Sequence, residues 1–396
     1  MLLLLGGCGE ERPREAPPNG GAVPQREVTP ARLAIGLTES NARLLAPPPA
    51  GVVGGAFAAW RQRVAELRPS HVRLLVDWAK LQPSRAAPPD LDAADDGCMR
   101  GRPPCAAYAG LLDRLRAIGA RGAEPVVLLY GTPDWAAPPA QGCDQQGTEP
   151  RTRPPDLDAY RSFVRSLVDL GRVAGVPLRV WSPWNEPNHP TFLTPQRARC
   201  DTSSAPLAPE GYARIVRAWR EAAGPAAHAL LGEVAGYDAP RDAAAGAAEF
   251  AAALPRDVAC SSAVWAQHAY VGSPADREGG APLAADPDRA GALALLEEVL
   301  GALDAKGCQR RHRVWITETA VAGEQRRTVE GCREMHTALS AWARHPRVDA
   351  AFQYTVREDP AFPTGLTGPG LGEPYPVLAA WQAWAARPGG PSAPPC

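Results

Sequence analysis

Eight short apolar runs alternate along most of the chain with longer amphipathic stretches. The runs span residues 32–37, 72–76, 125–130, 178–181, 229–233, 264–268, 313–317 and 350–354. Between the first two, Phe57, Trp60, Val64 and Leu67 follow the three-and-four spacing that places apolar groups on one helix face. Similar spacing predicts helices over residues 160–173, 212–223, 247–254, 290–303, 329–342 and 377–384. Such alternation is typical of parallel strands joined by crossover helices.

We therefore predict an α/β fold in which the eight units close into a single (β/α)8 TIM barrel, because closure removes exposed sheet edges. A doubly wound sheet is the alternative, but no Gly-x-Gly-x-x-Gly follows the first run. A chain of 396 residues fits one barrel, although two smaller domains stay possible on length alone. With 45% hydrophobic and 21% charged residues, the chain can bury a large core.

The ends of the chain differ from the barrel, which we place at residues 31–388. Residues 1–8 resemble the end of a bacterial lipoprotein signal in which Cys8 is lipidated, and an unstructured apolar terminus is the alternative. Residues 9–30 are rich in Pro, Gly and charge and predict a flexible tether. Residues 389–396 form a C-terminal tail. We expect an extracytoplasmic protein, secreted or attached to the cell surface through Cys8.

Nine cysteines without a Cys-x-x-Cys pair or a Cys/His cluster favour disulfides over a metal site. With Cys8 set aside, eight remain, and the sequence leaves their pairing open. The local choices are Cys98–Cys105 within one loop, Cys143–Cys200 between adjacent loops and Cys260–Cys308 below adjacent strands, which leaves Cys332 with Cys396.

The charge balance limits the possible partners. The 42 basic and 43 acidic side chains give no net field that would attract a phosphate backbone, so we expect no nucleic-acid partner. Seven scattered histidines include no His-x-His pair, which argues against a metal-dependent barrel hydrolase. We expect a monomer without metal or cofactor.

Two glutamates follow the fourth and seventh runs. The fourth run leads into Trp184-Asn185-Glu186-Pro187-Asn188, and the seventh ends at Ile316-Thr317-Glu318-Thr319. The carboxyl ends of barrel strands face one mouth, and strands four and seven lie opposite each other. The two carboxyls can therefore meet.

These two segments resemble the catalytic motifs of the clan A glycoside hydrolases, especially families 39 and 5, and the resemblance covers about residues 31–388. It implies a retaining glycosidase acting on a β-linked oligo- or polysaccharide, with Glu186 as acid/base and Glu318 as nucleophile. Because like charges held close together resist joint ionisation, we expect Glu186 to carry the proton while Glu318 is charged.

The resemblance also implies four supporting residues. Asn185 would donate to the sugar 2-hydroxyl, although an Asn there can simply form a turn. His268 and Tyr270 are two residues apart and thus share a strand face, with the Tyr hydroxyl on the nucleophile; a buried structural His is the alternative. Arg73 lies in an apolar run where burial demands an anionic partner, either the nucleophile or a structural ion pair.

Sugars present C–H faces on which aromatic rings at the mouth can stack. Trp78, Trp135 and Tyr354 end the second, third and eighth runs and are predicted to bind substrate, together with Asn188 of the first motif. The clan commonly has a Trp at the end of strand eight, where this chain has Tyr354. Four further tryptophans belong to predicted helix faces in the core: Trp60, Trp219, Trp342 and Trp384.

A surface lipoprotein that only binds glycan is the competing function. Such decayed barrels usually lose a catalytic carboxylate, whereas Glu186 and Glu318 are both present here. The sequence leaves open which sugar is cleaved, and whether cleavage occurs within chains or at their ends.

Overall fold

The computed structural model describes residues 33–46, 55–141, 149–237, 244–271, 291–387 and 389–396. Cys8, the predicted tether and Cys143 lie outside the described residues. One parallel sheet has the strand order β7-β6-β5-β2-β1-β11-β10-β9-β8. Its strands are β1 (Ala34–Thr38), β2 (His71–Asp77), β5 (Glu124–Tyr130), β6 (Val180–Ser182), β7 (His228–Ala229), β8 (Leu231–Val234), β9 (Val264–His268), β10 (Arg313–Thr319) and β11 (Val348–Tyr354).

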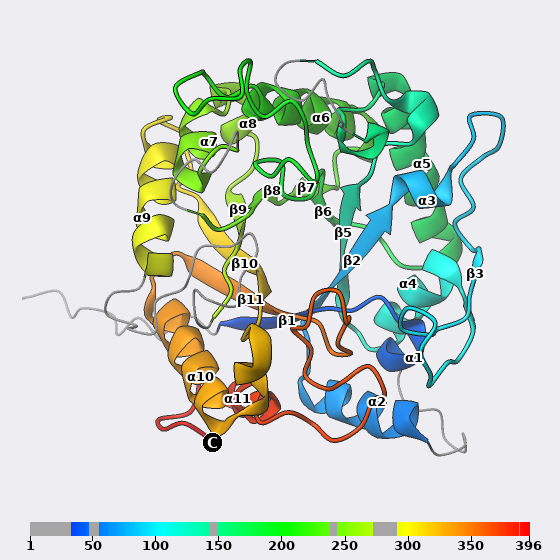
Figure 1. Cartoon of the computed structure of the whole chain (residues 1–396), viewed down its shortest axis with the longest axis vertical. Helices are drawn as coiled ribbons and strands as arrows, with labels where there is room; N and C mark the ends of the chain where they lie inside the picture. The colour runs from blue at the N-terminus through cyan, green and yellow to red at the C-terminus, as the bar shows by residue number, and fades with distance from the viewer. Residues whose placement is uncertain (1–32, 47–54, 142–148, 238–243, 272–290, 388) are drawn as a thin grey trace, which may run out of the picture.

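The sheet closes because its two outer members are one interrupted strand. Only Leu230 separates β7 from β8, and its backbone N–H donates to Trp181 of β6 over 2.7 Å. The nine segments thus form an eight-stranded ring, around which the helices are arranged in Figure 1. All eight predicted runs are strands, so the barrel prediction is confirmed and the doubly wound alternative is wrong.

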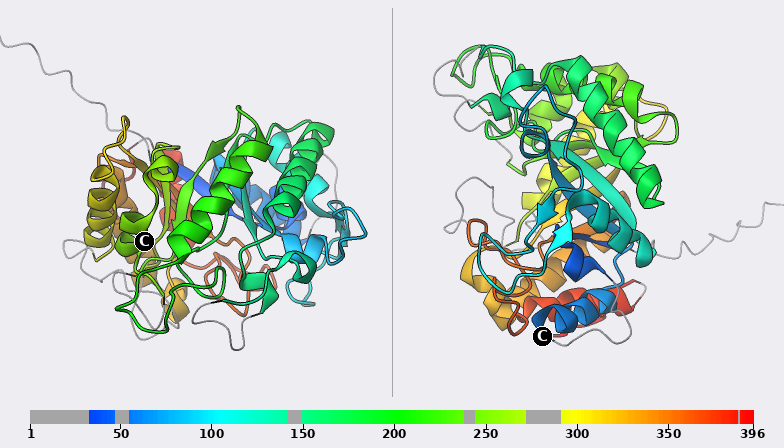
Figure 2. Two further views of the ribbon diagram at one scale, coloured as in Figure 1. Left: turned by 90° about the horizontal axis from the view of Figure 1, so that it is seen from above. Right: turned by 90° about the vertical axis from the view of Figure 1, so that its right-hand side faces the viewer.

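Helices cover the outside of the barrel. The longer ones are α2 (Ala56–Glu66), α4 (Gly110–Ala120), α5 (Leu157–Ala174), α6 (Ala208–Ala223), α7 (Ala247–Ala253), α9 (Gly291–Asp304), α10 (Val329–Arg344) and α11 (Val377–Ala386). Single turns form α1 (Ala42–Leu45), α3 (Trp78–Leu81) and α8 (Arg256–Ala259), and a small hairpin pairs β3 (Ala94–Asp95) with β4 (Tyr108–Ala109). Helix α11 contacts α10 and α2, and the right-hand view of Figure 2 shows it beside α2, so the last helix completes the outer layer next to the first unit. None of the described helices has the length and apolarity to span a bilayer.

The barrel interior is filled by side chains rather than left as a pore. Val126, Val180, Leu230 and Phe352 are among the buried residues of this inner cluster. Gly36 of β1 is needed there, because a Cβ at this position would lie 2.3 Å from the Phe352 ring. The four tryptophans predicted to face the core are at most 5% exposed: Trp60, Trp219, Trp342 and Trp384.

Three disulfides join described cysteines, and all three are pairs expected from the sequence: Cys98–Cys105, Cys260–Cys308 and Cys332–Cys396. The first closes the loop between β3 and β4. The last fastens the C-terminal tail to α10. Because Cys143 is not described, its pairing with Cys200 stays a prediction.

Candidate active site

Polar side chains converge where the barrel strands end. They come from five strands of the ring or the residues that follow them, as expected for side chains at the carboxyl ends of parallel strands. Arg73, Glu233 and His268 are completely buried, and Glu318 is 6% exposed. The full set is Arg73 on β2, Ser182 on β6 with Asn185 and Glu186 after it, Glu233 on β8, His268 at the end of β9 with Tyr270 after it, and Thr317 and Glu318 on β10.

Glu318 has a strong donor on each oxygen. The Arg73 guanidinium donates from Nη1 to Oε1 over 2.6 Å, and the Tyr270 hydroxyl donates to Oε2, also over 2.6 Å. A guanidinium and a hydroxyl are the partners that a carboxylate ion accepts from. Glu318 is thereby fixed in orientation as an ion.

Glu186 faces Glu318 with a different partner. Its Oε1 lies 2.7 Å from Nδ1 of His268, and its side chain is 17% exposed. One oxygen of Glu186, one oxygen of Glu318 and a ring nitrogen of His268 all lie within 4.8 Å of one another. Such spacing is compatible with a metal ion, but Arg73 already supplies the positive partner of Glu318.

The comparisons with known proteins agree with this barrel. A family 39 glycoside hydrolase from Bacteroides cellulosilyticus WH2 has a TM-score of 0.53 and 14% identity, over 92% of this chain and 65% of that one. A glucosidase from Croceicoccus marinus gives 0.55 and 15%, over 91% and 68%. GH5_18 from Bifidobacterium longum subsp. longum, in complex with Manb1-4GlcNAc, gives 0.53 and 17%, over 90% and 78%. This chain shares its (β/α)8 barrel fold with these glycoside hydrolases.

At such identities the likeness establishes the fold alone. The chain spans about two thirds of the length of the first two of these structures. No family model matches the sequence, and the search of curated proteins finds no match. What the site does must therefore be argued from its own residues.

The barrel brings together the six residues expected at the reaction centre. Besides the contacts of Glu186 and Glu318, Asn185 accepts from Nη2 of Arg73 over 3.0 Å and is 3% exposed. Arg73 is bound to Glu318, so the expected anionic partner is present. The ion pair has a second carboxylate as well, Glu233, whose Oε2 lies 2.9 Å from Arg73 Nη2.

The pKa shifts of the free site favour a proton on His268 over one on Glu186, where we expected it. Burial favours neutral imidazole, but the charge of Glu318 and the hydrogen bonds to Glu186 and Glu233 outweigh it and raise the pKa of His268 to about 10. Burial likewise favours a neutral Glu186, but the bond and charge of His268 lower the pKa of its carboxyl. The physical reason is that the His268 ring lies next to three carboxylates, those of Glu186, Glu233 and Glu318. Its proton is one hydrogen bond away from Glu186.

Two of the acids have unusual backbone conformations. Glu186 has φ +33° and Glu233 has φ +51°, a region that non-glycine residues seldom occupy. The two backbones are also joined, because the Glu186 N–H donates to the Glu233 carbonyl over 3.0 Å. Strained backbone of this kind concentrates at functional sites.

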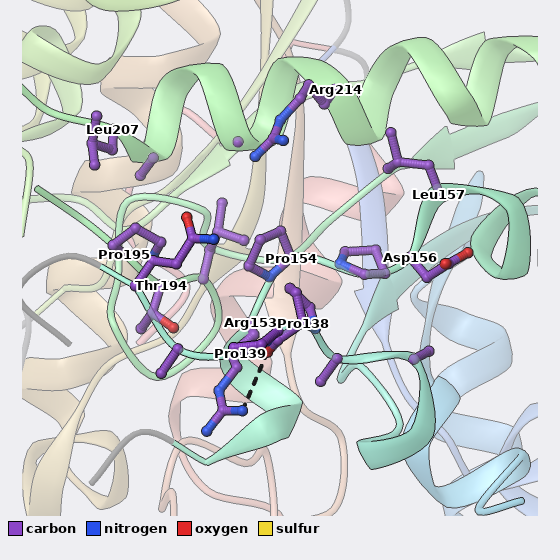
Figure 3. A pocket seen from close by; sticks show the side chains of 18 of the residues that line it. Pro138, Pro139, Arg153, Pro154, Asp156, Leu157, Thr194, Pro195, Leu207 and Arg214 are labelled. Carbon is purple, nitrogen blue, oxygen red and sulfur yellow. Dashed lines mark hydrogen bonds between the residues drawn. The ribbon is translucent and has the colours of Figure 1, made fainter. Parts of the chain in front are cut away.

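Three residues predicted to bind substrate do not reach this centre. Trp78 is 1% exposed and stacks on Phe163 in the core. Asn188 is completely buried, and its side chain bonds the backbone of Ala235 and Ala245, so its role is structural. Trp135 packs its ring edge-on against Trp78. It lines a separate cavity of about 520 Å³, walled by prolines and shown in Figure 3, whose lining includes neither Glu186 nor Glu318.

Tyr354 lies near Glu318, and a second tyrosine, Tyr130, lies near Tyr354. Burial, followed by the charge of Glu318, raises the pKa of the Tyr354 hydroxyl. Tyr130, at the end of β5, has a pKa raised to about 12 by burial and by the charge of Asp77. Tyr130 and Phe192 line a cavity of about 490 Å³ together with Arg151, whose guanidinium lies 2.9 Å from Asp77. This cavity was not foreseen, because its walls come from separate loops.

Glu233 is the charged residue of this set that the sequence reasoning missed. It accepts from Arg73, His268 and Thr317, and also from the hydroxyl of Ser182. The available signal was an acid inside the apolar run Leu230-Leu231-Gly232-Glu233-Val234. A buried charge needs a partner, which is the argument that singled out Arg73.

Proposed function

We propose that this chain is a retaining glycoside hydrolase that cleaves a β-linked oligo- or polysaccharide. The supporting observation is the pair of glutamates, whose oxygens approach within 4.8 Å. Retaining enzymes hold their two carboxyls about 5–5.5 Å apart, whereas inverting enzymes keep about 6.5–9.5 Å for a water molecule. The unequal partners of the pair support the proposed roles: Glu318 accepts from a guanidinium and a hydroxyl, and Glu186 lies next to the His268 ring nitrogen.

In the first half-reaction Glu318 attacks the anomeric carbon as the bond from that carbon to the leaving oxygen breaks. The leaving oxygen takes a proton from Glu186, which receives it along the 2.7 Å bond from His268. In the second half-reaction water attacks the same carbon and releases Glu318, while Glu186 accepts the water proton and returns it to Nδ1 of His268. Two inversions give retention, and both glutamates are regenerated.

Two neighbours assist the reacting sugar. Tyr270 donates to Oε2 of Glu318 and holds the nucleophile for attack. Asn185 is oriented by Arg73 through its carbonyl oxygen, which leaves its amide group as the donor for the sugar 2-hydroxyl. Such a contact strengthens as the ring flattens toward the transition state.

The cavity beside Tyr130 is the proposed place for a sugar unit next to the scissile bond. Its rings, Tyr130 and Phe192, can pack on C–H faces, while the Arg151–Asp77 pair can bond hydroxyls. This combination of walls suits a neutral sugar. A β-linkage is favoured because the similar GH5_18 structure holds Manb1-4GlcNAc.

An extracytoplasmic location belongs to the same proposal. Three disulfides among the described cysteines fit an oxidising compartment. A polysaccharide substrate is also met outside the cell. We keep Cys8 as the proposed site of lipid attachment.

The proposal is tested by the release of reducing ends from β-glucans, mannans and xylans, with Glu318→Gln as the matched control. We expect the wild type to release product from at least one of these glycans and the control to release none. A wild type that binds one of the glycans and never shortens it would instead be a glycan-binding protein.

A further inference from the structure

A third carboxylate, Glu233, lies behind the two glutamates and has no part in the two half-reactions described. It is completely buried at the carboxyl end of β8. A group without surface cannot attack a sugar or protonate one. Any effect of Glu233 on the reaction must therefore pass through other side chains.

Glu233 is bonded to four side chains from four other strands. Its Oε2 lies 2.9 Å from Arg73 Nη2, 2.8 Å from His268 Nε2 and 2.9 Å from the Thr317 hydroxyl. The Ser182 hydroxyl donates to the other oxygen. Two of these partners, Arg73 and His268, contact the catalytic pair directly.

We propose that Glu233 is a positioning residue of the glycosidase reaction, which anchors Arg73 against Glu318 and His268 against Glu186. The inference rests on the proposed function for its consequences in turnover, but its effect on His268 is independent of any substrate. Ser182 and Thr317 hold the Glu233 carboxylate in place for both tasks.

The effect on Arg73 is geometric. The guanidinium donates from Nη1 to Glu318 and from Nη2 to Glu233, so a carboxylate on each side fixes its plane. Without the second acid, the Nη2 end would keep only the Asn185 carbonyl and the long 3.3 Å contact to His268. The nucleophile would then be held by a less constrained cation.

The effect on His268 concerns which nitrogen exchanges a proton. Glu233 accepts at Nε2 and thereby keeps that nitrogen protonated, so Nδ1 is the one that shares a proton with Glu186. The charged and titratable groups that face the imidazole are Glu186, Glu233, Glu318 and Arg73. Removal of one acid from this set makes the imidazolium easier to deprotonate.

The sign of the pH effect follows. The pKa of His268 is raised to about 10, so its charged form persists below that pH and is lost above it. In Glu233→Gln the pKa of His268 falls, and the alkaline limb of kcat/KM moves to lower pH. When His268 no longer supplies Glu186 with its proton, kcat falls by about 10²-fold. KM stays close to the wild-type value because Glu233 does not touch substrate.

The experiment compares the wild type, Glu233→Gln and Ser182→Ala in two ways. Histidine ring ¹⁵N NMR follows the titration of His268, assigned by loss of its signal in His268→Gln, and needs no substrate. The pH profile of hydrolysis gives kcat and KM. Ser182→Ala removes one hydrogen bond but keeps the negative charge, so the alkaline limb should not move down.

A lower His268 pKa together with reduced kcat in Glu233→Gln supports the proposal. An unchanged titration and an unchanged profile in the folded variant would overturn it. If the wild type hydrolyses nothing, the NMR result still decides the role of Glu233 while the proposed function fails separately. If Glu233→Gln does not fold, Glu233→Asp keeps the charge on a shorter arm: reduced kcat at unchanged KM supports the role, and wild-type kcat contradicts it.

Discussion

At the scale of single residues, Arg73 joins two buried carboxylates through one guanidinium. It is fully buried and pairs with two carboxylates, Glu233 and Glu318, over 2.9 and 2.6 Å. A buried ion pair that loses one partner leaves an uncompensated charge, which costs more than the pair itself contributes. The stability of the fold and the proposed hydrolysis therefore both depend on the Arg73 guanidinium.

We expect Arg73→Met to lower the free energy of unfolding by about 3–5 kcal/mol and to abolish hydrolysis. Urea denaturation followed by far-UV circular dichroism measures the first effect. The matched control is Arg172→Met, whose side chain is 73% exposed and which should change stability by no more than about 0.5 kcal/mol. Equal stability of the two variants would mean that the buried pairs contribute little.

The cavity beside Tyr130 makes a separate prediction. If Arg151 bonds a sugar there, Arg151→Ala should raise KM about tenfold, equivalent to about 1.4 kcal/mol of lost binding, with kcat within a few-fold of the wild type. Steady-state kinetics on the best glycan measures both constants. Arg214→Ala, on the separate cavity of Figure 3, is the control and should leave KM unchanged. If only the Arg214→Ala control raised KM, the sugar would bind in the cavity of Figure 3, and the prediction for Arg151 would be wrong.

Sequence reasoning located most charged residues of the polar cluster. Glu186 and Glu318 were found because they follow apolar runs in segments that resemble known catalytic motifs, and Arg73 because a charged group within an apolar run needs a partner when it is buried. Trp78 was misjudged, since an aromatic residue at a strand end can turn inward as easily as toward the mouth. The role of Glu233 was missed because its partners lie on four other strands, and contacts so distant in sequence are visible only once the barrel has closed.

At the scale of elements, the eight strands could be predicted because each is an apolar run buried on both faces, as parallel strands are. Helix α4 was missed although Leu111, Leu115 and Ile118 follow the helical spacing and are buried. Gly110 and Gly119 near its ends lower the helix propensity and weaken the pattern. The split of the fifth strand at Leu230 has no sequence signal that we can identify.

The disulfides tie elements together and should stabilise them unequally. Chain entropy predicts a larger loss when a longer loop is released: about 4 kcal/mol for Cys260–Cys308, whose separation is 48, against about 2 kcal/mol for Cys98–Cys105, with a separation of 7. Double serine variants of each pair, compared by urea denaturation, give the order. The reverse order would mean that native contacts, rather than loop length, set the contribution.

At the scale of the whole molecule, the proposed reaction belongs to the barrel mouth, and the proposed lipid anchor is Cys8. We expect a Cys8→Ser form, made from the full precursor in a bacterium that lipidates such signals, to move from the membrane fraction to the soluble fraction. Two acyl chains give stable attachment, whereas a polar tether has no membrane affinity. Wild-type protein that is soluble and still carries an unmodified Cys8 would remove the anchor from the proposal.

We propose Glu186 as the acid/base and Glu318 as the nucleophile, and azide rescue of their alanine variants separates these two roles most directly. Glu318→Ala should be nearly inactive on every substrate, because the first half-reaction lacks its nucleophile. Glu186→Ala should still form the glycosyl-enzyme from an activated aryl glycoside, whose leaving group needs no proton, and should then hydrolyse it slowly.

Azide needs no deprotonation, so it should accelerate Glu186→Ala and yield a glycosyl azide of retained configuration. With Glu318→Ala it can only replace the nucleophile from the opposite face and yield the inverted azide. The anomeric configuration of the product, read by ¹H NMR, is the measurement. A retained azide from Glu318→Ala with an inverted azide from Glu186→Ala would exchange the two roles, and full turnover by both variants without azide would contradict the glycosidase assignment itself.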